Sequence, residues 1–169
     1  MQKKRLFHFL SLLLFSVLGT HAQQKGINED KYRISIRRAT AKVELDGKLD
    51  EADWQRADVG ADFWQGFPYD TSLALSQTQV RLLFDDQFIY VGAVCQQPRH
   101  YIIQTLRRDF EGGSSDVLSV YIDPFRDKLN GFNFAVNPYG VQREGLVANG
   151  QELTVSWDNK WYSRVTNYD

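Results

Sequence analysis

The stretch VELDGKLDEADW, which spans residues 43–54, holds five carboxylates around one glycine, and four of them are candidates for chemistry. They are Asp46, Asp50, Glu51 and Asp53. Such side chains could hydrolyse a glycosidic bond, which needs two acids facing each other across a cleft, or bind calcium through hard oxygen ligands. They could also shape the backbone, because Asp-Gly is a strong turn signal and acidic residues favour a helix N-terminus. We expect the backbone role, with a turn at Asp46–Gly47, a short helix capped by Asp50 and no catalytic residue. A structural calcium ion stays open as the alternative.

Six other side chains are candidates for holding a ligand by stacking and hydrogen bonding. A sugar ring has an apolar face that stacks on tryptophan, while arginine, aspartate and asparagine bond its hydroxyls. The candidate carbohydrate-binding residues are Trp64, Arg108, Asp109, Asn137, Trp157 and Trp161. Each has a structural alternative: the tryptophans could fill the core, Arg108 and Asp109 could form an ion pair that fixes a loop, and Asn137 could hold a turn.

The N-terminal residues have the pattern of an export signal. Basic residues at 3–5 precede an apolar run over 6–18, and small residues lead up to Ala22, which is the layout of a secretory signal peptide. The predicted divisions are a signal peptide at 1–22, a flexible leader at 23–33 and one domain at 34–169. The predicted location is the periplasm, the outer-membrane surface or the surrounding medium.

Charge and composition exclude several classes of function. The chain has 20 Lys and Arg against 21 Asp and Glu, and the signal peptide takes three basic residues with it, which leaves 17 against 21. This acidic balance disfavours nucleic acid and anionic membranes as partners. After cleavage His100 is the one histidine left, so a zinc site or a Ser-His-Asp triad has no support. Cys95 is the only cysteine and lies in the apolar stretch FIYVGAVC, which predicts a buried thiol.

The elements that must position these residues are predicted to be short strands. TQVRLLF and FIYVGAVC form a hairpin across DDQ, and FNFAVNP and VQREGLVA form a second around Tyr139–Gly140. Further extended pieces are expected in RISIRRA, VEL, YIIQTLRRD, DVLSVYIDP and the end of WDNKWYSRVTNYD. Many short strands joined by Gly, Asn and Asp turns are typical of an all-β chain that folds as an antiparallel β-sandwich.

Five stretches in this order resemble a known family. They are LDGKLDEADW, TQVRLLFDDQFIYVGAV, RRDF followed by SDVLSVYID, FNFAVNPYGVQRE and WDNKWYSRV. Together they resemble the carbohydrate-binding module family 9-like domain, in the version found at the N-terminus of a bacterial cell-envelope family of unknown function. The resemblance covers residues 34–169. It implies an exported β-sandwich that binds saccharides, carries structural calcium and precedes a β-rich outer-membrane region.

The chain departs from that family's sugar-binding pattern. The first clamp tryptophan of the family falls in EGGSS, the sugar-binding glutamate falls at Ser119, and an arginine falls at Ala135, although the family's asparagine matches Asn137. The second clamp tryptophan would lie beyond Asp169, and further strands would follow there, so we expect a sandwich that is incomplete at its C-terminus.

Two functions follow as expectations. The first is a saccharide-binding module without catalysis of its own, linked to carbohydrate breakdown as part of a larger cell-envelope protein. The alternative is a structural accessory domain that packs on an outer-membrane β-barrel or on a partner protein. Beyond calcium, no cofactor is predicted, and the acids around the strand DVLSVYIDP are further calcium candidates: Asp116, Asp123 and Asp127.

Overall fold

The computed structural model describes residues 32–96, 100–110, 113 and 115–168. The predicted signal peptide lies outside these residues, as does nearly all of the predicted leader. Within the described part of the chain, no helix is long and apolar enough to cross a bilayer.

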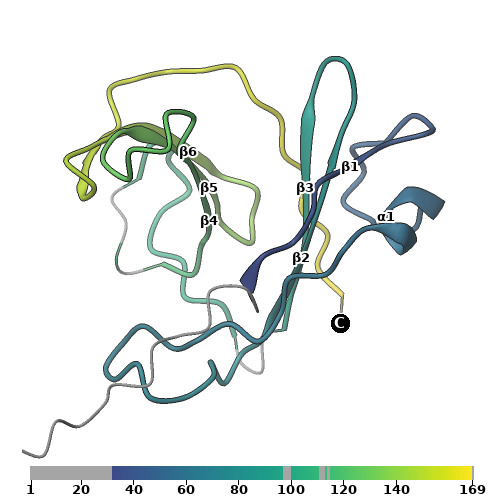
Figure 1. Cartoon of the computed structure of the whole chain (residues 1–169). Coiled ribbons are helices and arrows are strands. Elements are labelled where there is room, and N and C mark those ends of the chain that lie inside the picture. Colours follow the sequence, from purple (N-terminus) through teal and green to yellow (C-terminus); the bar gives the residue numbers. More distant parts are fainter. Residues whose placement is uncertain (1–31, 97–99, 111–112, 114, 169) are drawn as a thin grey trace, which may run out of the picture.

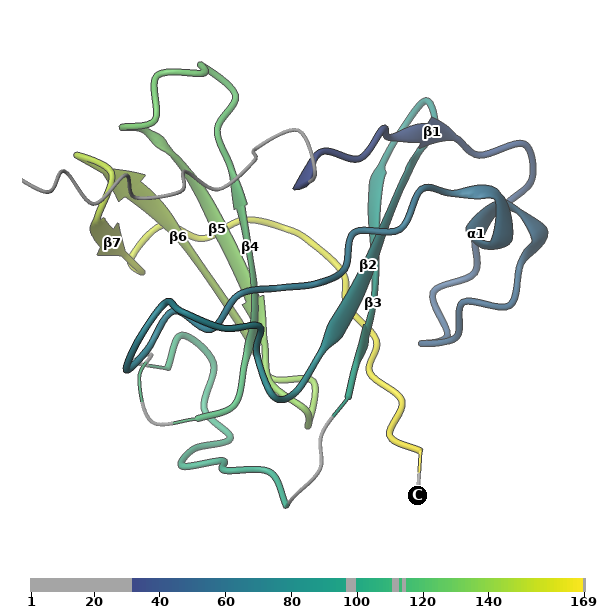
Figure 2. The same ribbon diagram turned by 60° about the horizontal axis from the view of Figure 1, so that its bottom comes forward.

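The described residues are mostly β, as predicted, and form two sheets (Figure 1). The three-stranded sheet has the order β1-β2-β3 and the four-stranded sheet the order β4-β5-β6-β7. The strands are β1 (Arg37–Arg38), β2 (Thr78–Phe84), β3 (Ile89–Cys95), β4 (Leu118–Ile122), β5 (Gly131–Val136), β6 (Gln142–Ala148) and β7 (Glu152–Thr154), and the helix is α1 (Ala52–Arg56). The two sheets stand apart as separate layers, with α1 on the outer side of the smaller one (Figure 2).

Both predicted hairpins are confirmed by their strand pairing, and residues within each turn fix its shape. Between β2 and β3, the Asp85 carboxylate accepts the backbone N–H groups of Gln87 and Phe88, each at 2.8 Å. The same carboxylate accepts the Tyr90 hydroxyl at 2.6 Å, and this hydrogen bond raises the pKa of Tyr90 to about 12. Between β5 and β6, the turn contains Gly140 at φ 78°, a left-handed conformation that glycine adopts at no steric cost.

Three of the other predicted strands are wrong, and in each of them backbone N–H groups donate to side chains rather than to a neighbouring strand. VEL at 43–45 forms no strand, since the Glu44 N–H donates to the Glu51 carboxylate at 2.8 Å. The segment after β7 is likewise irregular and is held by side-chain contacts described below. The predicted piece YIIQTLRRD, residues 101–109, forms no strand either, since the N–H groups of Ile102 and Gln104 donate to Asp116 and Ser115. β7 was not predicted.

Two further corrections concern β1 and Cys95. RISIRRA contributes only the two residues of β1, and they pair parallel with β2, so the smaller sheet is mixed rather than purely antiparallel. Cys95 is exposed rather than buried, because it is the last residue of β3, where the strand leaves the sheet.

The small buried core lies between α1 and the smaller sheet. Trp54, Ala57 and Leu83 are almost fully buried, with Leu49 and Tyr90 packed against them. A side chain at Gly92 on β3 would lie 2.7 Å from Leu49 and 3.0 Å from the Trp54 ring, so only glycine lets α1 pack this closely. The helix therefore turns Trp54 towards the sheet, and Ala57, just past its last residue, faces the same core.

The opening acidic stretch does shape the backbone, but with different roles for its members. Asp46 accepts the Lys48 N–H at 2.8 Å and forms the predicted turn with Gly47, whose φ is 85°. Asp50 is not the cap, because the helix N-cap is Glu51 and it makes no side-chain capping bond. Asp53 is buried and ties α1 to the chain before it.

The Asp53 carboxylate links α1 to the segment before it because it accepts several hydrogen bonds. The N–H groups of Thr40 and Ala41 donate to it at 2.9 and 3.1 Å, the Thr40 hydroxyl at 3.0 Å, and Arg56 forms an ion pair with it. These hydrogen bonds, led by the one from the Thr40 backbone and opposed by burial, lower the pKa of Asp53 to about 2.

Asp53→Asn is expected to lower the free energy of unfolding at neutral pH. The stability of the variant should also fall less than that of the unchanged protein as the pH is lowered. The folded-state pKa is about 2 against an ordinary value of 3.8, so the carboxylate stabilises the fold above about pH 4, and that contribution is lost as the pH falls towards 2. The measurement is the urea midpoint of both proteins between neutral pH and pH 2. Asp50→Asn, at an exposed carboxylate of the same stretch, is the matched control. An equal dependence of the urea midpoint on pH in all three proteins would contradict the stabilising role of the Asp53 carboxylate.

Candidate functional site

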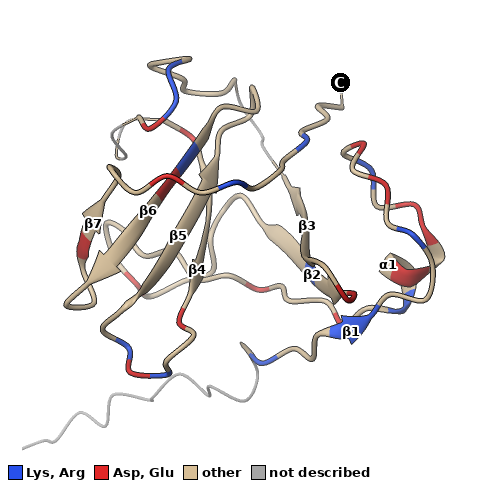
Figure 3. Cartoon of the chain, turned by 90° about the horizontal axis from the view of Figure 1, so that it is seen from above, with Lys and Arg blue, Asp and Glu red and all other residues tan. Residues whose placement is uncertain are grey.

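One face of the larger sheet is covered by aromatic side chains from the C-terminal segment. The register pairs Phe134 of β5 with Glu144 of β6 and Phe132 with Leu146, so these four side chains share a face. After β7 the chain crosses over this sheet (Figure 3). The Trp157 ring lies 5.0 Å from Phe132, and the Trp161 ring lies 5.4 Å from Phe134, between ring centroids. Both tryptophans are therefore half-buried packing residues of this face.

Glu144 is the buried charged group at the centre of this face. Its carboxylate forms an ion pair with Arg108 and accepts the Trp161 indole N–H at 2.9 Å and the Asn159 backbone N–H at 3.5 Å. Burial by itself raises the pKa of Glu144, but the hydrogen bonds from Trp161 and Arg108 outweigh it, so the pKa lies below its ordinary value. The group is an ionised carboxylate held by donors on several sides.

Arg108 links this carboxylate to the surface. Its guanidinium also donates to the Gln142 side chain at 3.0 Å and lies 3.3 Å from the Asp158 carboxylate. The Asp109 carboxylate is 3.8 Å away. The hydrogen bond to Glu144 raises the pKa of Arg108. We call the set Arg108, Asp109, Gln142, Glu144, Asp158 and Trp161 the Arg108 cluster.

Asp109 brings Arg108 to this face by bending the chain around the edge of β6. Its φ of 56° is left-handed, which aspartate tolerates better than most residues. Its N–H donates to the Gln142 carbonyl at 3.1 Å, on the part of β6 that β7 leaves unpaired. Arg108 therefore lies on the tryptophan side of β6. Phe110 lies on the other side, against the Arg143 guanidinium.

An open hollow of 560 Å³ adjoins the cluster. It is lined by Thr105, Arg107, Arg108, Asp109 and Phe110. The side chains of Arg108 and Asp109 are 45% and 39% exposed, and that of Asp158 is 88% exposed. These polar groups are thus accessible to a ligand while Glu144, at 1%, is not.

The structure brings together four of the six predicted binding residues. Arg108, Asp109, Trp157 and Trp161 meet around β5 and β6. Asn137 is buried, and its carbonyl oxygen accepts the N–H groups of Tyr139 and Val141 at 2.9 and 3.0 Å, so it holds the hairpin turn.

Trp64 lies in another loop. It is 42% exposed, and its indole N–H donates to the Tyr32 hydroxyl at 2.5 Å. This hydrogen bond ties the tryptophan to the N-terminal side of the described chain rather than to the Arg108 cluster.

Sequence reasoning missed Gln142, Glu144 and Asp158. The sequence does hold a signal for the first two. Pairing the two strands residue by residue outward from the Tyr139–Gly140 turn places positions 142, 144 and 146 on the same face as Phe132 and Phe134. A charged residue among aromatic neighbours needs a partner. Nothing in the sequence pointed to Arg108 as that partner, since the two residues lie far apart along the chain.

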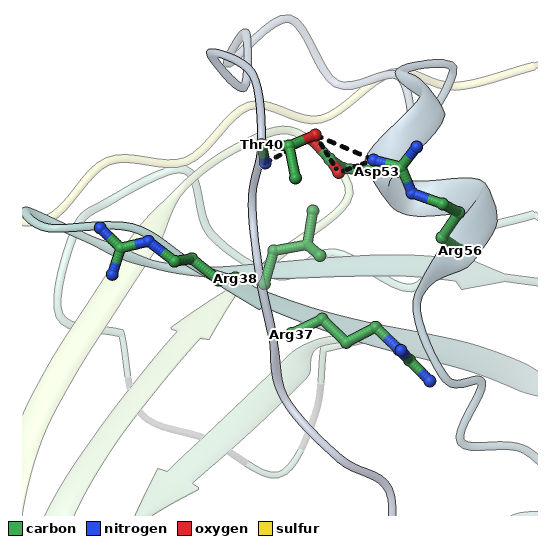
Figure 4. Close-up of a pocket in the computed structure, with 6 residues that line it drawn as sticks. Arg37, Arg38, Thr40, Asp53 and Arg56 are labelled. Carbon is green, nitrogen blue, oxygen red and sulfur yellow. Dashed lines mark hydrogen bonds and ion pairs between the residues drawn. The ribbon is translucent and has the colours of Figure 1, made fainter.

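A second hollow, of 450 Å³, lies beside α1 and is lined by Arg37, Arg38, Thr40, Asp53, Arg56 and Leu83 (Figure 4). Its arginines are already paired: Arg37 with Asp58 at 2.8 Å, Arg38 with Asp86, and Arg56 with Asp53. Arg37 and Arg38 extend in opposite directions from β1 (Figure 4). Their pairing and divergence fit a structural role, in which they hold β1 and α1 to the smaller sheet.

The acids considered for calcium do not gather. Within the described ranges, no group of three or more His, Cys, Asp or Glu side chains is placed to hold a metal ion. Asp123 and Asp127 instead accept backbone N–H groups of their own turn, at 2.8 to 3.1 Å.

No protein-family model, curated protein or solved structure matches the chain.

Proposed function

We propose that the protein is an exported, non-catalytic saccharide-binding module with a β-sandwich fold of the carbohydrate-binding module family 9-like type. Two sheets in separate layers and the five ordered stretches support the fold. The observation that carries the function is the Arg108 cluster, where partly exposed charged side chains stand beside a half-buried tryptophan and an open hollow.

The chemistry of the cluster suits hydroxyl groups. Arg108 can donate hydrogen bonds to sugar oxygens, while Asp109 and Asp158 can accept from sugar hydroxyls. The exposed part of the Trp161 ring offers an apolar surface on which a sugar can stack. Glu144 sits behind them and fixes both Arg108 and Trp161, so the binding groups are held in place before a ligand arrives.

The same geometry disfavours hydrolysis. A retaining or inverting glycosidase needs one protonated carboxylic acid and a second carboxylate across the scissile bond. Glu144 is buried with a lowered pKa, and its carboxylate shares Arg108 with Asp158. This arrangement supports a binding role in which neither carboxylate transfers a proton.

Asp158→Ala is expected to weaken saccharide binding about tenfold, the value of one hydrogen bond to a charged group. Its side chain is 88% exposed, so stability should hardly change. The measurement is calorimetric titration of the purified protein with neutral mono- and oligosaccharides, with and without calcium. Asp50→Asn, remote from the cluster, is the control. Saccharide binding that is equally strong in Asp158→Ala would exclude the Arg108 cluster as the site.

A second candidate function is an accessory domain that docks on an outer-membrane β-barrel or a partner protein. It is favoured by the loop between α1 and β2, where Phe67, Tyr69 and Leu75 are 85%, 74% and 94% exposed. Exposed apolar side chains in one loop are common at protein interfaces. A folded protein that gives no heat with any saccharide would favour this candidate over the first.

A further inference from the structure

The two arginines that line the hollow beside the Arg108 cluster differ in their charge partners. Arg108 is neutralised by Glu144 and Asp158, and Asp109 adds a further carboxylate. Arg107 lines the same hollow with Thr105. Arg107 is exposed, and its guanidinium makes no ion pair with any carboxylate of the described residues. Among the described residues that line the hollow, Arg107 alone carries a positive charge without a carboxylate partner.

A second arginine without a carboxylate lies behind the hollow. Arg143 is 5% exposed, and its guanidinium carbon is 5.3 Å from the centre of the Phe110 ring, which lines the hollow. Its one side-chain hydrogen bond goes to the neutral Asn133 side chain at 3.4 Å, and its Nε is buried without a partner. Among the described residues no carboxylate pairs with it.

These two arginines make the Phe110 side of the hollow electropositive. A buried charge is poorly screened by water, so the field of Arg143 reaches further than that of a surface arginine. A guanidinium presents a fork of N–H donors that matches the oxygens of a carboxylate or sulfate. An anion beside Arg107 would thus gain one direct partner and a favourable field from behind Phe110.

We infer that the ligand of this hollow is an acidic saccharide, whose carboxylate or sulfate binds Arg107 while its hydroxyls bind Arg108 and Asp109. The inference rests on the proposed saccharide-binding function and narrows it to one class of ligand. Thr105 lines the same hollow, its oxygen accepts the Arg107 backbone N–H at 3.0 Å, and its hydroxyl can donate a hydrogen bond to the anion. Asp109 and Asp158 would repel the anionic group of the ligand if it lay beside Arg108, so they favour the orientation with the anion at Arg107.

The test compares sugars that differ only at one carbon. Glucose, glucuronic acid and glucose 6-sulfate, and the matching galactose series, are titrated into the purified protein by calorimetry at low salt. We expect at least one acidic sugar to bind about fivefold more tightly than its neutral parent. The advantage should shrink at high salt, because the anion contact at Arg107 is exposed to screening.

Arg107→Gln is expected to remove this preference, so that the acidic and neutral sugars of each series bind the variant equally. Arg126→Gln is the matched control. It removes the same charge from the turn between β4 and β5, at the opposite end of β5 from Val136, which pairs with Gln142. This variant should keep the preference.

Three outcomes would overturn the inference. If a neutral sugar binds as tightly as its acidic partners, the inference fails and the saccharide-binding function stands. If Arg107→Gln keeps the full preference, the anion lies elsewhere and the assigned contact fails. If none of the six sugars binds to protein that circular dichroism shows to be folded, the inference and the proposed function fail together.

Discussion

Replacing Trp54 with alanine is expected to lower the free energy of unfolding by about 3–5 kcal/mol, the usual cost of truncating a large buried aromatic. Trp54 is 3% exposed and forms the small core with Ala57 and Leu83. The gap left by the indole would lie beside Gly92, which has no side chain to fill it. Domains of this size are stable by about 5–15 kcal/mol, so the variant would be close to unfolding at room temperature.

Trp54→Phe is the matched control for this prediction. The Trp54 indole N–H is buried and has no hydrogen-bond partner among the described residues, so phenylalanine loses no bond there and keeps most of the volume. We expect a cost below about 1.5 kcal/mol. The measurement is chemical denaturation followed by far-UV circular dichroism. Equal midpoints for the alanine variant and the unchanged protein would show that this cluster is not the core.

Replacing Glu144 with alanine is expected to cost about 3 kcal/mol, at the lower end of the range for breaking a buried ion pair. The variant leaves the Trp161 indole N–H and the Asn159 N–H without their acceptor. The loss of Glu144 costs less at Arg108, because the Arg108 side chain is 45% exposed to water and keeps Gln142 and Asp158 as partners. The C-terminal segment that crosses the sheet should loosen first.

Glu144→Gln separates the charge from the hydrogen bonds. The amide oxygen still accepts the Trp161 N–H but gives up the ion pair with Arg108, so an intermediate loss of stability is expected. Because the pKa of Glu144 is lowered in the folded protein, its contribution is present above its ordinary pKa and is lost as the pH falls through the lowered one. Both variants should therefore show less acid sensitivity in urea denaturation than the unchanged protein. Unaltered stability in Glu144→Ala would show that the ion pair contributes nothing.

The parts of the fold that could be predicted are those set by neighbours in sequence. The hairpin from β2 to β3 follows from alternation and from the Asp85 turn, and the hairpin from β5 to β6 follows from Asn137 and Gly140. The burial of Trp54 follows from its helical spacing with Ala57. In each case a local pattern and the tertiary packing favour the same structure.

The errors arise where a distant side chain satisfies the backbone. VEL has the composition of a strand, but the Glu51 carboxylate takes the hydrogen bond of Glu44. Asp50 has the position of a cap, but the helix begins one residue later and Asp53 bonds across to Thr40. Periodicity cannot indicate such contacts, because they depend on which segments meet in space.

The candidate site divides in the same way. Tryptophan, arginine and aspartate could be singled out by their chemistry, and four of the six residues do converge. Their meeting point depends on Glu144, which the hairpin register places among aromatic rings, and on the left-handed Asp109, which carries Arg108 around β6. Asn137 was a candidate by residue type, but its side-chain oxygen already accepts a hydrogen bond from the Tyr139 N–H within the turn.

The parallel pairing of β1 with β2 has a consequence for the order of folding. It joins Arg37 to Leu83 and Arg38 to Phe84, so a long loop that contains α1 must close before these two residues pair. Local hairpins form in microseconds, whereas contacts between distant residues wait for loop closure. β1 is therefore expected to dock after the rate-limiting step, and a substitution there should speed unfolding while leaving the folding rate unchanged.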